Sequence, residues 1–187
     1  MYQNIQKGIN RTKRLYIYRL VGTQIFICHM IKDHESFMQQ AIQQSRLGMQ
    51  AGSGGPFGCV IVKAGEVIAA GFNEVLSSSD PTAHAEIVTI RRACKHLQSF
   101  QLTGCQLYTS CEPCPMCLGA IYWARPDQVF YANTKADAAA IGFDDHFIYD
   151  EIALPAEQRK MPLCHLPLLQ AKEVFDHWAE KENKMMY

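Results

Sequence analysis

One histidine and two cysteines of this chain have the types and the spacing of zinc ligands. Cys114 and Cys117 lie three residues apart in the segment EPCPMC. Two thiolates at that spacing can reach one metal ion from the start of a helix, whose N-terminus stabilises negative charge. His84 adds an imidazole from a second segment. Because one imidazole and two thiolates form a ligand set that suits zinc, we predict a zinc site at these three residues.

Glu86, two residues after His84, is the candidate for proton transfer at that site. Structural zinc sites have four protein ligands, whereas catalytic sites have three and leave a fourth position for water. Zinc lowers the pKa of the water that it binds to about 7, which makes hydroxide available near neutral pH. If the ion lies beyond the N-terminal end of the helix, Glu86 can take the proton of that water and deliver it to a leaving group.

The complete pattern, H-x-E followed by P-C-x-x-C, is the signature of zinc-dependent base deaminases. Pro113 completes it together with the four residues above. The five residues are far more specific than a lone C-x-x-C, so we expect a hydrolytic deaminase. The alternative is a zinc-stabilised binding domain without activity, in which Cys111 is a fourth ligand. The presence of Glu86 argues against this alternative.

Helix and strand patterns alternate in the first half of the chain. A helix is expected from an N-cap at Asp33 to about Met49. The segment 57–72 is predicted to form two strands joined at Ala64-Gly65. The next helix is expected to begin at the cap Asp80.

Further elements follow, and their order predicts an α/β domain. We expect a strand over 105–110, a helix from about Pro115, a strand over 127–132 and a final helix over 168–184, with 134–165 unassigned. This order implies layers of helices on a sheet with parallel neighbouring strands. It also places the histidine and the cysteines at one sheet edge, beyond the strands' carboxyl ends.

Length and composition fit one globular domain. Of the 187 residues, 48% are hydrophobic and 19% charged, which excludes a disordered chain. Eighteen basic and eighteen acidic residues cancel, so the net charge gives no reason to expect a nucleic-acid partner. The crowding of cysteines into 111–117 favours metal chemistry in a reducing compartment over disulfides, and we expect a cytoplasmic protein.

Residues 1–29 differ from the rest of the chain. They contain basic residues and no acid, followed by a twelve-residue apolar run that is too short to span a membrane. We expect an extension outside the domain, disordered or non-native, with Met30 as an alternative start. A targeting leader is the other possibility, although no cleavage pattern supports it.

Four segments resemble bacterial guanine deaminases of the cytidine-deaminase fold: GGPFG (54–58), DPTAHAE (80–86), YTSCEPCPMCLGAIYWARP (108–126) and GFDD (142–145). The resemblance covers about residues 33–187. It implies a three-layer α/β/α domain over 30–187, with a central mixed sheet and helices on both faces. It also implies Zn²⁺ as the cofactor and the conversion of guanine to xanthine and ammonia.

The resemblance also implies the residues that bind the substrate. Asn73 would hydrogen-bond the purine, and the backbone of Ala85 would contact the base. Phe57 and Trp123 match aromatic positions that line the pocket, which suits a flat base.

Two further assignments come from the resemblance alone. Asp145 matches a carboxylate near the amino group of the substrate, where it would assist proton transfer. Tyr187 matches a C-terminal tyrosine that closes the pocket of the neighbouring subunit in a domain-swapped homodimer.

Two other substrates remain open. A guanosine deaminase could use almost the same pocket with room for ribose, and the residues that discriminate lie within 134–165. A tRNA adenosine deaminase shares the zinc motif but should present a basic surface, which the balanced charge does not favour.

Overall fold

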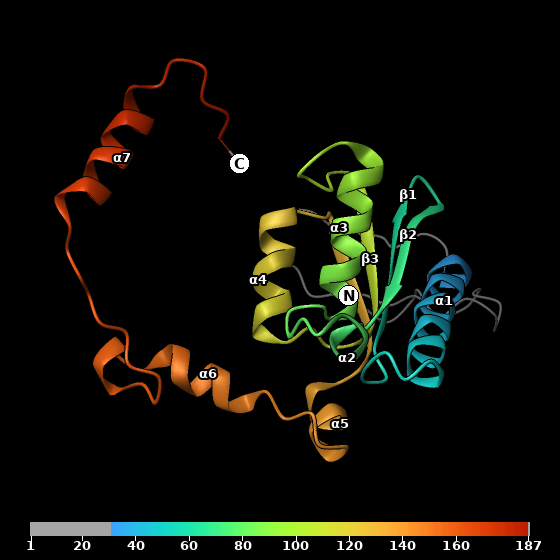
Figure 1. The fold of residues 1–187 in the computed structure, drawn as a ribbon. Helices are drawn as coiled ribbons and strands as arrows, with labels where there is room; N and C mark the ends of the chain where they lie inside the picture. Colours follow the sequence, from blue (N-terminus) through green and yellow to red (C-terminus); the bar gives the residue numbers. More distant parts are fainter. Residues whose placement is uncertain (1–30, 187) are drawn as a thin grey trace, which may run out of the picture.

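The computed structural model describes residues 31–186, which are built around a four-stranded sheet (Figure 1). The strands are β1 (Gly58–Lys63), β2 (Glu66–Phe72), β3 (Cys105–Cys111) and β4 (Gln128–Asn133), in the order β2-β1-β3-β4. β1 is antiparallel to both of its neighbours, whereas β3 and β4 are parallel. The sheet is therefore mixed, as predicted.

The hairpin of β1 and β2 closes at the two residues predicted from the sequence. Ala64 and Gly65 have φ of 51° and 84°. Positive φ at both residues is typical of the two-residue turns whose twist matches paired strands. β1 lies between β2 and β3 and is antiparallel to both. The expectation of parallel neighbouring strands is therefore wrong for these two pairs. That expectation is confirmed for β3 and β4, which are joined through helix α4 (Pro115–Ala124).

Helix α1 (Ile31–Gln50) covers one face of the sheet. Phe37 and Ala41, four residues apart and therefore on one side of the helix, pack against Val60 and Val62 of β1.

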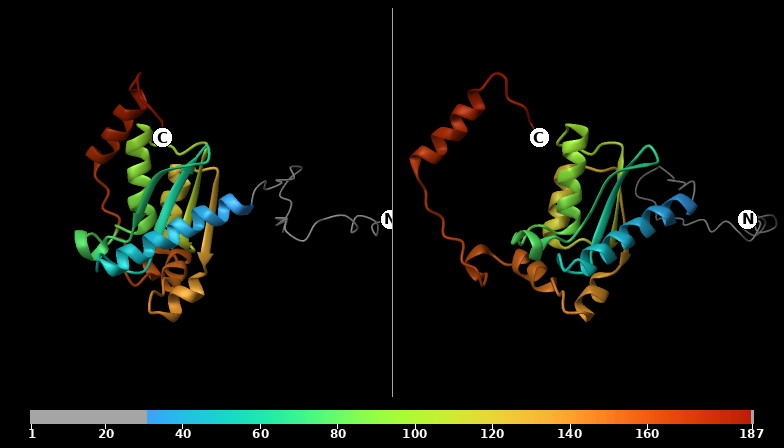
Figure 2. Two further views of the ribbon diagram at one scale, coloured as in Figure 1. Left: turned by 90° about the vertical axis from the view of Figure 1, so that its right-hand side faces the viewer. Right: turned by 45° about the vertical axis from the view of Figure 1, so that its right-hand side comes forward.

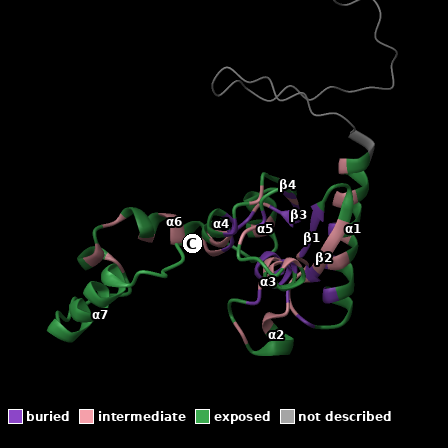
Figure 3. Cartoon of the chain, turned by 90° about the horizontal axis from the view of Figure 1, so that it is seen from above, coloured by how far each residue is buried: buried purple, intermediate pink, exposed green. Residues whose placement is uncertain are grey.

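Helix α3 (Ala85–Leu97) packs on the opposite face, and α4 packs beside α3. Because side chains alternate along a strand, Cys59 and Ile61 of β1 point to this side and pack with Ala93 and Ile121. Figure 2 shows α1 on one side of the strands and α3 and α4 on the other. Figure 3 shows buried residues gathered on the strands between them. The three-layer α/β/α class is confirmed.

Two predicted helix starts are wrong. Asp33 lies inside the first turn of α1 and is not its N-cap. α3 begins at Ala85 and its N-cap is His84. Asp80 instead closes a turn before the helix, because its Oδ1 accepts hydrogen bonds from the backbone N and the hydroxyl of Thr82 at 2.8 and 2.7 Å. A short helix that the sequence did not predict, α2 (Val75–Ser78), precedes this turn.

The segment after β4, which the sequence left unassigned up to residue 165, contains short helices. These are α5 (Lys135–Ala140), α6 (His146–Ala153) and a 3₁₀ turn (Ala156–Gln158). The predicted C-terminal helix is confirmed as α7 (Leu169–Glu180), which ends four residues before the expected end. Figure 1 shows α6 and α7, in orange and red, extending away from the sheet.

Within 31–186, no helix combines the length and the apolar character that crossing a membrane requires. The predicted extension at 1–29 and Tyr187 lie outside the described residues.

Candidate active site

The N-terminal ends of α3 and α4 bring the predicted zinc ligands together. His84 is the N-cap of α3 and Cys114 is the N-cap of α4, and both have extended backbone conformations. Pro115 occupies the first turn of α4, where its missing N–H costs no hydrogen bond. The structure therefore places the histidine and the cysteines at the starts of two helices, as the sequence predicted.

The three side chains have the geometry of ligands to one ion. His84 Nδ1 lies 3.5 Å from the Sγ atoms of both Cys114 and Cys117, and the three ligand atoms lie within 4.8 Å of one another. Tetrahedral zinc, with bonds of about 2.0 Å to nitrogen and about 2.3 Å to sulfur, separates an N and an S ligand by roughly 3.5 Å. The residues present therefore fit zinc.

The negative charge of the Cys114 thiolate supports a cation site. The pKa of the Cys114 thiol is lowered to about 4, chiefly by the hydrogen bond from Cys117 and also by His84. The interaction with the Cys114 thiolate, followed by burial, raises the pKa of the Cys117 thiol. The hydrogen bond to Cys114 also raises the pKa of the His84 imidazole. A thiolate held at two helix N-termini is a site for a cation that binds soft ligands.

Glu86 converges on the same point from the first turn of α3. Its side chain is buried, and its Oε2 accepts a hydrogen bond from Cys117 Sγ at 3.4 Å. Its Oε1 accepts a hydrogen bond of 2.8 Å from the hydroxyl of Thr109. Burial raises the pKa of the Glu86 carboxyl. Glu86 thus adjoins the ligand group without belonging to it.

Cys111 is not placed as a fourth ligand. It lies at the end of β3, and its Sγ donates to the carbonyl of Thr134 at 3.6 Å. Burial and the nearby Glu86 raise the pKa of its thiol to about 11. Among the described residues, the group that could hold a metal consists of one histidine and two cysteines. This arrangement favours the catalytic interpretation over the structural zinc site.

A cavity of about 310 Å³ opens beside Glu86 and His84. That volume is at the lower end of the range of small-molecule sites. Phe57, Asn73 and Asp145, three of the predicted site residues, line it. Asn73 is buried and its Oδ1 accepts a hydrogen bond of 3.1 Å from the N–H of Val75, so its amide nitrogen is the donor for a ligand.

Sequence reasoning missed a wall of the cavity that comes from the segment after β4. The ring of Phe143 meets Phe57 edge to face, with centroids 4.9 Å apart. The segment also contributes Lys135, Ala138, Gly142, Asp144, Phe147 and Ile148 to the lining. The pattern T-x-x-D at Thr134–Asp137 could have revealed a helix start there, since it forms a reciprocal cap.

Asp145 lies in the same segment, as the residue before α6. Partial burial, followed by the charge of Cys114, raises the pKa of its carboxyl. A carboxyl with a raised pKa beside a cavity is suited to proton exchange with a ligand.

Trp123 and Ala85 are not among the residues that line the cavity. In this single chain α4 buries Cys117, Ile121 and Ala124 and turns Trp123 outward, where it is 66% exposed. It borders a separate apolar groove with Ile90 and Phe100. Ala85 is fully buried between His84 and Glu86.

Comparisons with known proteins agree with this site. Residues 31–133 match the cytidine and deoxycytidylate deaminase zinc-binding region. The chain is 56% identical to the guanine deaminase of Bacillus subtilis (strain 168) over 155 residues, which are 83% of this chain and 99% of that protein. It is 32% identical to the tRNA-specific adenosine deaminase of Aquifex aeolicus over 148 residues, which are 79% of this chain and 94% of that protein.

Solved structures show the same relationship. The X-ray structure of the Bacillus subtilis guanine deaminase covers 82% of this chain and 98% of its own, with a TM-score of 0.80. A guanine deaminase structure from Nitrosomonas europaea, 34% identical, covers 60% of this chain and 65% of its own, with a TM-score of 0.57. The predicted family is confirmed, and this chain belongs to the zinc-binding cytidine and deoxycytidylate deaminase family.

Proposed function

We propose that this chain catalyses the hydrolytic deamination of guanine with a bound zinc ion. Water adds at the carbon that carries the 2-amino group, ammonia leaves, and the product is xanthine. The observation that carries the reaction type is the buried Glu86 beside the group of His84, Cys114 and Cys117. The choice of guanine is supported by 56% identity to a guanine deaminase over most of both chains.

His84, Cys114 and Cys117 would hold the zinc ion, as their mutual distances allow. When bound, zinc supplies Lewis-acid activation of water near neutral pH. The two helix N-termini stabilise the negative charge of the thiolate ligands.

Glu86 moves the proton in this proposal. The hydrogen bond from Thr109 fixes one carboxylate oxygen, so the other oxygen, Oε2, faces the ligand group. It takes a proton from the attacking water and gives it to the departing nitrogen. Burial raises the pKa of Glu86, which makes it a stronger base than an exposed carboxylate.

The cavity would hold the purine flat against Phe57. Asn73 donates a hydrogen bond from its amide nitrogen, the backbone at Ala85 contacts the base, and Asp145 exchanges a proton near the amino group. These roles are supported by the positions of Phe57, Asn73 and Asp145 along the cavity.

The C-terminal segment supports a homodimer in which tails are exchanged. α7 exposes large apolar side chains, with Phe175 78%, Val174 64% and Trp178 43% exposed, and a folded monomer rarely leaves a contiguous apolar patch uncovered. We propose that one subunit's tail, ending in Tyr187, covers the other subunit's cavity. The domain would comprise residues 30–187, and the free cysteines of the described part of the chain suit a cytoplasmic location.

The proposal is tested by the product. Incubation of the zinc-loaded protein with guanine should yield xanthine and one equivalent of ammonia, detected by chromatography and an ammonia assay. The Glu86→Gln variant is the control for contaminating activity. Absence of xanthine with the zinc-loaded wild-type protein would overturn the proposal.

A further inference from the structure

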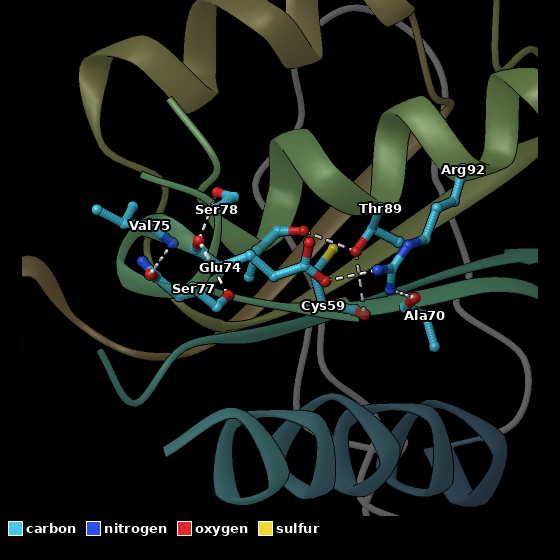
Figure 4. Close-up of polar contacts among 10 residues, drawn as sticks. Cys59, Ala70, Glu74, Val75, Ser77, Ser78, Thr89 and Arg92 are labelled. Atoms are coloured by element: carbon cyan, nitrogen blue, oxygen red, sulfur yellow. Dashed lines mark hydrogen bonds and ion pairs between the residues drawn. The ribbon is translucent and has the colours of Figure 1, made fainter. Parts of the chain in front are cut away.

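Arg92, on the outer side of α3, connects the edge strand of the sheet to the loop that carries two site residues. Its Nη1 donates to the carbonyl of Ala70 on β2 at 2.8 Å, and its Nη2 donates to Oε1 of Glu74 at 2.5 Å. Figure 4 shows the guanidinium between these two acceptors. One side chain thereby ties together α3, β2 and the segment 73–84.

Glu74 is the central residue of that segment. Its N–H donates to the carbonyl of Ala83 at 2.9 Å, next to His84. Its carbonyl accepts the hydroxyls of Ser77 and Ser78, as the dashed lines of Figure 4 show. The Glu74 side chain is about one quarter exposed, so its bond to Arg92 is partly shielded from water.

Asn73 precedes Glu74 and depends on the same segment for its position. Its backbone N–H donates to the carbonyl of Phe57 at 3.0 Å, and its Oδ1 accepts from Val75 N. The bond from Val75 N spans Glu74, so the backbone of Glu74 must keep its conformation for the Asn73 amide to face the cavity. Whatever fixes Glu74 therefore also fixes Asn73.

Arg92 can contact the Ala70 carbonyl because α3 packs closely against β2 at Gly71. A Cβ atom on Gly71 would lie 2.7 Å from the hydroxyl oxygen of Thr89 and 3.2 Å from Nη1 of Arg92. The absence of a side chain at Gly71 thus lets the guanidinium lie directly over the edge strand.

We propose that Arg92 and Glu74 are positioning residues for substrate binding, which act by holding Asn73 in the conformation that meets the purine. This inference rests on the proposed role of Asn73. His84 has separate supports, because its N–H bonds the carbonyl of Thr82 and its own carbonyl accepts the N–H of Val88. Loss of the Arg92–Glu74 contact should therefore weaken guanine binding and spare the metal site.

The test compares Arg92→Met, Glu74→Met and the double variant with the wild-type protein. Each single variant should raise KM for guanine about 3- to 10-fold, as the loss of one hydrogen bond does, with kcat and zinc content near the wild-type values. The double variant should be no worse than the single ones, because the two residues act through each other. Glu74→Gln keeps an oxygen acceptor and should restore most of the affinity.

Arg91→Met is the matched control. Arg91 is the neighbouring arginine, more exposed, and its contact with Asp80 is a longer one of 3.6 Å. Its removal should change KM by less than about twofold. Thermal melting of each variant separates a folding defect from a binding defect.

Asn73→Ala distinguishes the possible failures. If Asn73→Ala raises KM but Arg92→Met and Glu74→Met do not, the positioning role is wrong and the role of Asn73 stands. If Asn73→Ala leaves KM unchanged, Asn73 does not bind guanine, and Arg92 cannot act on guanine binding by holding Asn73. Loss of zinc in Arg92→Met would also overturn the inference, because it would mean that the contact supports His84.

Discussion

The hydroxyl of Thr109 donates a hydrogen bond of 2.8 Å to Oε1 of Glu86, and both side chains are buried. Thr109 lies on β3, two residues before its end, and Glu86 lies in the first turn of α3. The contact ties the proposed proton carrier to the rigid sheet rather than to a loop. A general base needs this kind of fixed orientation relative to the proton that it takes.

Glu86→Gln should retain zinc and lose turnover. The amide keeps the size of the side chain but cannot take up a proton, so kcat should fall by about 10²- to 10⁴-fold. Steady-state kinetics and metal analysis of the purified variant give both values. A variant that has lost its zinc would mean that Glu86 supports the metal.

Substitutions of Thr109 should change kcat less than Glu86→Gln does, according to whether they keep the hydrogen bond to Glu86. Thr109→Val removes the hydrogen bond to Glu86 at nearly constant volume and should lower kcat by only about tenfold. Thr109→Ser, which keeps the hydroxyl, should stay close to the wild-type rate. Equal rates for the valine and serine variants would contradict a role for this bond.

Cys114→Ala should lose zinc, whereas Cys111→Ala should keep it. Cys114 lies within ligand distance of His84 and Cys117, while Cys111 bonds the Thr134 carbonyl. Metal analysis and the melting temperature with and without a chelator measure the difference. Chelation should destabilise the wild-type protein and the Cys111 variant, and have little effect on Cys114→Ala. A Cys111 variant without zinc would revive the structural four-ligand site.

Gly55→Ala should impair guanine binding through the aromatic wall of the cavity. An added Cβ would lie 2.8 Å from Phe143 Cζ and 2.9 Å from Phe57 Cε2, so one of the rings must shift. We expect KM for guanine to rise about tenfold with zinc content unchanged. The control is Gly119→Ala on α4, where an added Cβ meets nothing within 4 Å. A Gly55 variant with wild-type KM would mean that this wall does not contact the substrate.

Removal of Tyr187 should lower guanine turnover without unfolding the protein. In the proposed dimer the terminal side chain closes the neighbouring cavity, and loss of a closing group exposes the reaction to water. Kinetics, melting temperature and the mass in solution measure activity, stability and dimer content. Unchanged kinetics would remove the closing role, and a monomeric wild-type protein would remove the exchange of tails.

The sequence predicted the group of His84, Cys114 and Cys117 that the structure brings together, with Glu86 beside it, because motif spacing reports the chemistry of such residues directly. It misplaced the start of α3, since Asp80 uses its carboxylate on Thr82 and the chain stays extended to His84. It missed Phe143 because α5 and α6 are too short to show a helical period. It did not show that Trp123 lies outside the cavity of a single chain, since the type of an aromatic residue does not reveal which side of a helix will be buried.

The most direct test of the proposed function is ammonia release by the zinc-loaded protein, measured with several substrates in parallel. Guanine, guanosine, adenine, cytosine, cytidine and a tRNA with a wobble adenosine cover the alternatives. Guanine alone should release ammonia at a substantial rate. Release from guanosine but not from guanine, or from the tRNA alone, would contradict the proposed substrate and leave the zinc site as the part of the account that stands.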